Sequence, residues 1–97
     1  MTTQAGETFD LMYEVLLHPD AREIYTKADK ALAKKIARCL EQLEQTPILH
    51  PNIKALKGDF AGYYRYRIGE YRVIYSVENE LVQVLVVTIV HRSEAYE

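Results

Sequence analysis

The spacing of apolar residues divides the first half of the chain into a strand followed by two helices. Residues 9–17, FDLMYEVLL, are rich in residue types that fit a pleated, half-buried surface. Pro19 suits the first turn of a helix over residues 19–27. Asp29 is a suitable N-cap for a second helix over residues 30–45. The apolar residues at helical spacing are Ala21, Ile24, Tyr25 and Ala28 in the first helix, and Leu32, Ile36, Cys39, Leu40 and Leu43 in the second.

The second half alternates between turn residues and runs typical of strands. Residues 48–59 contain proline, asparagine and glycine and are predicted to form a loop. Three antiparallel strands are then predicted over residues 62–68, 71–77 and 81–91. The last strand is apolar on both faces, which favours an interior position covered by helices on one side. The order strand, helix, helix and three strands predicts a two-layer α+β domain.

The connection between the first two of these three strands determines which side chains share a face. If Gly69 and Glu70 form a two-residue turn, Arg67 lies opposite Arg72. One face then carries Tyr63, Arg65, Arg67 and Arg72, and the other carries Tyr64, Tyr66, Ile68, Tyr71, Val73 and Tyr75.

The aromatic face is expected to join the core, and the arginine face suggests a bound anion. Like charges directly opposite one another destabilise a sheet unless something offsets them. A phosphodiester is the natural candidate, because guanidinium groups match its oxygens. The alternative is that these arginines pair with acidic side chains on a solvated face. A bulge in either strand would shift the facing.

Charge and composition are compatible with a basic site on an acidic protein. The 97 residues suit one domain, and 48% hydrophobic with 27% charged residues is typical of a globular protein. The net charge of −2 argues against a protein that simply coats nucleic acid. Residues 50–75, however, carry five basic residues against two acidic ones, whereas the first 29 residues are predominantly acidic. The basic residues are therefore concentrated in one segment.

Several classes of protein are disfavoured. The chain has no apolar run long enough to span a bilayer and no signal-peptide pattern at its start, so a cytoplasmic location is expected. Cys39 cannot form an internal disulfide and is expected to fill the core. Histidines and carboxylates do not show ligand spacing, and no glycine-rich phosphate loop or nucleophile motif is present. We therefore expect neither a metal nor a cofactor.

Four segments together resemble the RelE/ParE superfamily of toxins from type II toxin–antitoxin pairs, and its RelE branch more than its ParE branch. They are MYEVLLHPDA, the helical hairpin ending in LEQTP, KALKGDFAGYYRYRIGEYRVIY and VTIVHRSEAY. The resemblance covers residues 12–96 and implies the RelE-like fold, with the order of elements predicted above. It implies a single toxin domain over residues 12–97, preceded by an N-terminal extension, residues 1–11, that continues into the first strand.

The resemblance also implies an activity and residues that perform it. The RelE branch is known for cleaving messenger RNA in the ribosomal A site without a metal, by attack of the 2′-hydroxyl on the adjacent phosphate to give a 2′,3′-cyclic phosphate. Arg65, Arg72 and Arg92 match family arginines or basic residues that would stabilise the phosphorane. Tyr96 matches a terminal tyrosine that would stack or transfer a proton. Residues expected to position the RNA are Lys54, Lys57, Tyr63, Arg67 and His91.

One position departs from the family pattern and leaves the general base open. Where the best-known members carry a lysine, two positions before the equivalent of Arg65, this chain has Tyr63. Tyr96, Tyr63 and His91 are the candidates. A histidine titrates near the working pH, whereas a tyrosine would need its pKa lowered by neighbouring arginines.

Two other functions share the expected fold, so the fold cannot separate them from the nuclease. One is a ParE-like protein that poisons DNA gyrase and cuts no RNA. The other is a degenerate member that only binds its partner. In every case the resemblance implies a small acidic antitoxin with a disordered wrapping segment and a toxin–antitoxin hetero-oligomer, and the basic face would need neutralising when idle.

Overall fold

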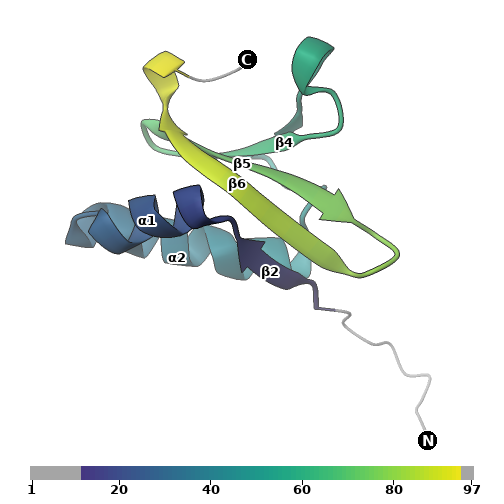
Figure 1. Ribbon diagram of the computed structural model, residues 1–97, viewed down its shortest axis with the longest axis horizontal. Helices are drawn as coiled ribbons and strands as arrows, with labels where there is room; N and C mark the ends of the chain where they lie inside the picture. The colour runs from purple at the N-terminus through teal and green to yellow at the C-terminus, as the bar shows by residue number, and fades with distance from the viewer. Residues whose placement is uncertain (1–11, 95–97) are drawn as a thin grey trace, which may run out of the picture.

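The computed structural model describes residues 12–94 and has two layers (Figure 1). The two helices, α1 (Pro19–Lys27) and α2 (Lys30–Gln45), lie against one face of a five-stranded sheet. Within the described residues no α-helix covers the opposite face, which we call the open face. The sheet order is β2-β6-β5-β4-β3, with β2 at Glu14–Leu17, β3 at Ile53–Ala55, β4 at Tyr64–Ile68, β5 at Tyr71–Glu78 and β6 at Gln83–His91. The predicted two-layer α+β fold is confirmed.

The sheet is larger than the sequence pattern predicts. β2 joins β6 in parallel, and the other neighbours pair antiparallel. The expectation of a three-stranded sheet after the helices was wrong, because β3 forms within the predicted loop 48–59 and adds an edge strand. Three residues are too few to show a strand period, and β3 is held by its pairing with Tyr64–Tyr66. Both helices have the predicted bounds. The predicted extension, residues 1–11, lies outside the described residues.

The core lies between the helices and the sheet. Ile36, Cys39 and Leu43 project from one side of α2 and are buried against strand residues such as Val73 and Val84. Burial raises the pKa of the Cys39 thiol to about 12, so the thiol stays protonated and Cys39 is a core residue, as expected. No helix among residues 12–94 has the length and apolar character needed to cross a membrane.

Short polar contacts are found at both ends of α2. At the start of α2 the carboxylate of Asp29 accepts a hydrogen bond of 2.8 Å from the backbone N–H of Leu32. Beyond its end, the buried hydroxyl of Tyr75 on β5 donates a hydrogen bond of 2.7 Å to the backbone carbonyl of Pro47. Burial raises the pKa of Tyr75, which keeps this hydroxyl protonated as a donor. The loop that leads from α2 to β3 is thereby attached to the sheet.

Replacing Tyr75 with phenylalanine should destabilise the fold by about 1–2 kcal/mol, because a buried carbonyl acceptor loses its donor. Urea denaturation followed by circular dichroism measures the change. Tyr25→Phe is the matched control, because the Tyr25 hydroxyl has no hydrogen-bond partner within residues 12–94. Equal midpoints for the two variants would contradict the role given to the Pro47 contact.

Candidate functional site

The turn between β4 and β5 arranges the arginines as the sequence predicted. Gly69 has φ 62°, a conformation that glycine adopts without strain. Arg67 pairs with Arg72, and Arg65 pairs with Ile74. Tyr66, Ile68, Val73 and Tyr75 belong to the core on the helix side. Because side chains alternate along a strand, Arg65, Arg67 and Arg72 lie on the open face.

The edge strand β3 adds a fourth cation to this group. Lys54 pairs with Arg65, so one row across the open face consists of Lys54, Arg65, Ile74 and Thr88. The next row consists of Arg67, Arg72 and Val90. We call Lys54, Arg65, Arg67 and Arg72 the basic rows. Lys54 and Arg67 are exposed, Arg65 is half-buried, and Arg72 is only 9% exposed.

Backbone carbonyls orient the two less exposed guanidinium groups. Arg65 donates through Nη1 to the carbonyl of Asn52 at 2.7 Å. Arg72 donates through Nη1 to the carbonyls of Tyr71 at 3.3 Å and Gly69 at 3.5 Å. Carbonyls of the loop before β3 and of the β4–β5 turn therefore help to orient both groups. This arrangement lowers the entropic cost of presenting them to an anion.

Arg92 is paired with a carboxylate of its own chain, the alternative that the sequence left open. Its Nε lies 2.8 Å from Oε1 of Glu70, and its backbone N–H donates to the Glu70 carbonyl at 2.6 Å. Both side chains are about 60% exposed. These contacts attach the 3₁₀ turn η2 (Arg92–Glu94) to the β4–β5 turn. An ion pair this exposed is weak and can exchange partners.

The structure separates His91 from the basic rows. A β-bulge between Ile74 and Tyr75 shifts the β5–β6 register, so that Tyr71 rather than Glu70 lies opposite His91. The two rings meet edge-on, with centroids 5.3 Å apart, and Tyr71 packs against the core. His91 Nδ1 accepts the backbone N–H of Ser93 at 3.2 Å. Its side chain thus lies on the helix side of the sheet.

Tyr63 lies beside the basic rows, in a hollow of the open face. The hollow has a volume of about 230 Å³ and is lined by Phe60, Tyr63, Ile74, Val87 and Thr88. Tyr63 is 37% exposed, and its carbonyl accepts the backbone N–H of Leu56 at 2.9 Å, which closes the loop that carries the 3₁₀ turn η1 (Gly58–Phe60).

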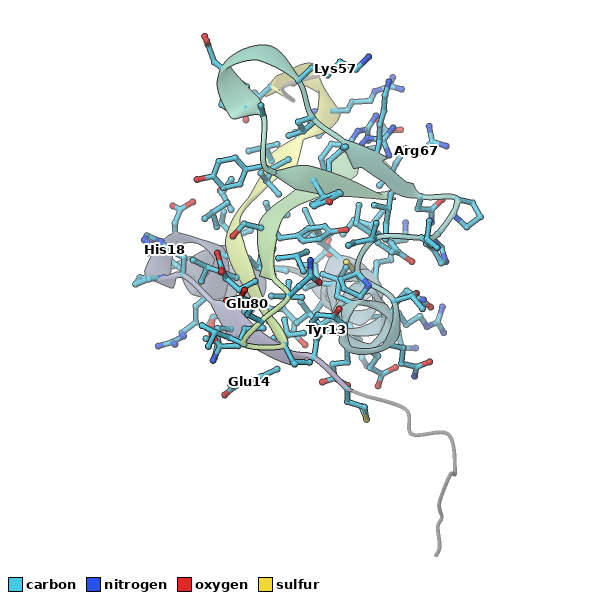
Figure 2. All side chains as sticks on the ribbon, turned by 90° about the vertical axis from the view of Figure 1, so that its right-hand side faces the viewer. Tyr13, Glu14, His18, Lys57, Arg67 and Glu80 are labelled. Carbon is cyan, nitrogen blue, oxygen red and sulfur yellow. The ribbon has the colours of Figure 1, made fainter. Side chains whose placement is uncertain are left out.

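Of the two remaining predicted residues, Lys57 and Tyr96, the structure describes only Lys57. Exposed Lys57 precedes η1, and Figure 2 shows it at the same end of the molecule as Arg67. Tyr96 lies outside the described residues.

The sequence did not point to the hollow beside Tyr63. The predicted pairing did place Ile74 beside Arg65, but Phe60 comes from a loop that no pattern positions.

Metal ligands are not grouped in the described part of the chain. Among residues 12–94 there is no cluster of three or more histidine, cysteine, aspartate or glutamate side chains that could hold a metal ion. The ionisable groups of the basic rows and of Tyr63 are guanidinium, ammonium and phenol groups.

Comparison with solved structures finds the same fold in known toxins. A chain of the archaeal RelE–RelB complex from Pyrococcus horikoshii OT3 is 27% identical, with a TM-score of 0.74 over 87% of this chain and 99% of that chain. The YoeB dimer from Staphylococcus aureus is 26% identical, with a TM-score of 0.66 over 79% and 93%. The toxin–antitoxin complex RelBE2 from Mycobacterium tuberculosis, at 24% identity, gives a TM-score of 0.74 over 87% and 95% and shows the fold alone.

Comparison by sequence gives the family directly. No curated protein matches the chain. The sequence model described as the ParE toxin of the type II toxin–antitoxin system parDE matches residues 15–96, most of the chain. The resemblance to the RelE/ParE superfamily is thereby confirmed, and the chain belongs to the ParE toxin family of type II toxin–antitoxin systems.

Proposed function

We propose that this toxin is a metal-independent endoribonuclease that cleaves messenger RNA, on the ribosome, at the open face of its sheet. The observation that carries the proposal is the convergence of Lys54, Arg65, Arg67 and Arg72 in two adjacent rows. Guanidinium groups bind phosphate oxygens in a fixed fork geometry, so this surface suits a phosphodiester. An RNA strand on a translating ribosome is such a ligand, and this site requires a cytoplasmic location.

The reaction proposed is transfer of the phosphoryl group within the RNA. The 2′-oxygen bonds to the adjacent phosphorus, and the bond from phosphorus to the 5′-oxygen breaks, which leaves a 2′,3′-cyclic phosphate and a 5′-hydroxyl. One proton leaves the 2′-hydroxyl, and one is delivered to the departing 5′-oxygen. Negative charge develops on the phosphorane oxygens in between. Stabilisation of that charge by Arg65 and Arg72, already oriented by backbone carbonyls, is the largest contribution expected.

Tyr63 is better placed for proton transfer than His91. Tyr63 lies on the open face beside the basic rows, whereas the His91 ring contacts Tyr71 on the helix side. Tyr96 keeps the role that the resemblance implies. A candidate base must lie within hydrogen-bond reach of the proton that it removes. This requirement favours Tyr63 over His91.

The hollow next to the basic rows supports an unpaired RNA strand as substrate. The rings of Phe60 and Tyr63 line it, together with Ile74. Stacking of a base on an aromatic side chain contributes about 1–3 kcal/mol per base and is available only to unstacked nucleotides. Lys54, Lys57 and Arg67 would contact phosphates on either side of the scissile one.

An antitoxin is the expected protein partner. The solved RelE of Pyrococcus horikoshii is in complex with RelB, and YoeB of Staphylococcus aureus is also solved in a YoeB–YefM complex. We infer a similar toxin–antitoxin hetero-oligomer for this chain, with an acidic antitoxin segment that neutralises the basic rows.

The matching family model favours a second candidate, a ParE-like inhibitor of DNA gyrase that cuts no RNA. A supercoiling assay with purified gyrase separates it from the nuclease. Inhibition of supercoiling without cleavage of a translated message would establish this second function in place of the first.

Arg72→Ala should reduce cleavage of a translated message by at least about 100-fold, the effect of removing one preorganised donor from a developing oxyanion. Arg92→Ala should also abolish cleavage and growth inhibition. Primer extension in a reconstituted translation system measures the loss. Arg67→Ala is the control on the same face, and it should cause a smaller loss because this exposed side chain only positions RNA. Full cleavage by folded Arg72→Ala and Arg92→Ala variants would overturn the assignment.

Glu70→Gln should raise the rate of cleavage about two- to fivefold when the message is at a subsaturating concentration. The reason is that Arg92 no longer has to break its ion pair with a carboxylate before it contacts phosphate. The same primer-extension assay measures the rate, and Glu80→Gln, which removes an exposed carboxylate elsewhere, is the control. A loss of activity as large as that of Arg92→Ala would show instead that Glu70 holds Arg92 in its working position.

A further inference from the structure

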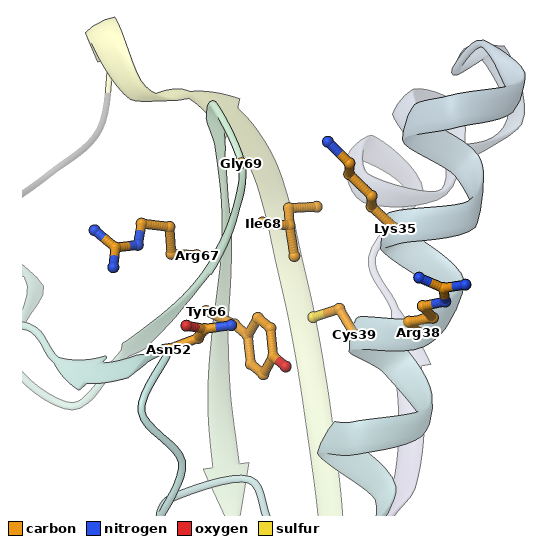
Figure 3. A pocket seen from close by; sticks show the side chains of 8 residues that line it. All are labelled: Lys35, Arg38, Cys39, Asn52, Tyr66, Arg67, Ile68 and Gly69. Atoms are coloured by element: carbon orange, nitrogen blue, oxygen red, sulfur yellow. The ribbon is translucent and has the colours of Figure 1, made fainter.

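A second basic site lies on the helix side of the sheet, between α2 and β4. It is a pocket of about 220 Å³ (Figure 3). Lys35 and Arg38 form the wall on α2, one turn apart and therefore on the same side of the helix. Tyr66, Asn52 and the Gly69 turn form the opposite wall. Arg67 also lines the pocket, but Figure 3 shows its guanidinium pointing to the other side of β4.

The lining of this pocket is positively charged and contains no acidic residue. Lys35 and Arg38 are exposed, and neither side chain forms an ion pair with another residue of the 12–94 segment. Lys35 and Arg38 give this concavity a local positive charge in a protein with a net charge of −2. Such a site attracts an anion.

The opposite wall supplies polar groups that favour a bound phosphate over diffuse counterions. Burial raises the pKa of Tyr66, so its phenol remains a neutral hydrogen-bonding group, and the Asn52 side chain lines the same wall. Lys35 Nζ lies 3.2 Å from the position that a Cβ on Gly69 would occupy. The ammonium group is thus close to the turn that also carries the basic rows.

We propose that this pocket binds a phosphate group of an RNA strand, as a second contact beyond the cleavage site. This inference rests on the proposed function. The pocket and the basic rows lie on opposite sides of β4, beside the edge of the sheet that β3 forms. Lys54 and Arg67, the two exposed members of the basic rows, lie on β3 and β4 at this edge. A single strand that leaves the open face over this edge can pass from these two cations to the pocket.

The test uses the full chain and a 12-nucleotide single-stranded DNA, which has no 2′-hydroxyl and therefore cannot be cleaved by the proposed reaction. Fluorescence anisotropy over a range of salt concentrations measures its dissociation constant for Lys35→Ala/Arg38→Ala and for the control Lys30→Ala/Lys34→Ala. Both doubles remove two charges from exposed positions of α2, but only the first changes the pocket. Amide chemical shifts report where the oligonucleotide binds.

The pocket double variant should weaken binding about tenfold and reduce the salt slope by about 0.7, the value for one phosphate contact to a single strand. The control should change both by much less, and the amides of Lys35, Arg38 and Asn52 should shift on titration. Equal losses in the two doubles, or unshifted pocket amides, would overturn the proposal. So would a polyglutamate peptide that shifts these amides where the oligonucleotide does not, because the pocket would then serve an acidic protein.

This inference and the proposed function fail in different ways. Binding in the pocket without cleavage of a translated message would overturn the proposed nuclease function and still support the phosphate site. Cleavage by the wild-type chain with unshifted pocket amides would overturn the phosphate site and still support the nuclease function.

Discussion

The two-residue turn at Gly69 and Glu70 is the constraint on which the candidate site depends. It fixes the register of β4 against β5, and a slip of one residue would move every side chain of one strand to the other face. With the observed register Tyr66 and Val73 enter the core together, and Arg67 and Arg72 reach the open face together. Burial of the apolar side therefore holds the like charges near one another. The hydrophobic effect supplies the free energy that offsets their repulsion.

The same turn also organises groups that are distant in the sequence. Its carbonyl at Gly69 orients Arg72, Glu70 holds Arg92 from the far end of β6, and Lys35 of α2 lies against its outer side. A glycine is favoured at position 69 because φ is positive there. One tight turn thus connects the basic rows, the C-terminal 3₁₀ turn and the pocket on the helix side.

The sequence pattern predicted those features that depend on interactions between residues close together in the chain. Helix bounds followed from Asp29 as N-cap and from helical spacing, and the facing of Arg67 and Arg72 followed from the turn. The side on which His91 lies could not be predicted in this way. Strict alternation from Val84 and Val86 would turn His91 towards the open face, but the bulge between Ile74 and Tyr75 inserts one residue and reverses the rest of β6. The position of a bulge depends on packing across the sheet, and the alternation of residue types along one strand does not predict it.

Contacts between distant segments account for the other features that sequence reasoning missed. β3 forms because residues 53–55 pair with the edge of β4. Without this pairing Lys54 would have no fixed position beside Arg65. The pocket between α2 and β4 requires Lys35 and Asn52 to meet across the core, which no spacing along the chain encodes. Because β3 ends the sheet, the open face and the helix side meet at an edge that no other strand covers within residues 12–94. The edge strand therefore does more than extend the sheet: it places cations where a polyanion can pass from one face to the other.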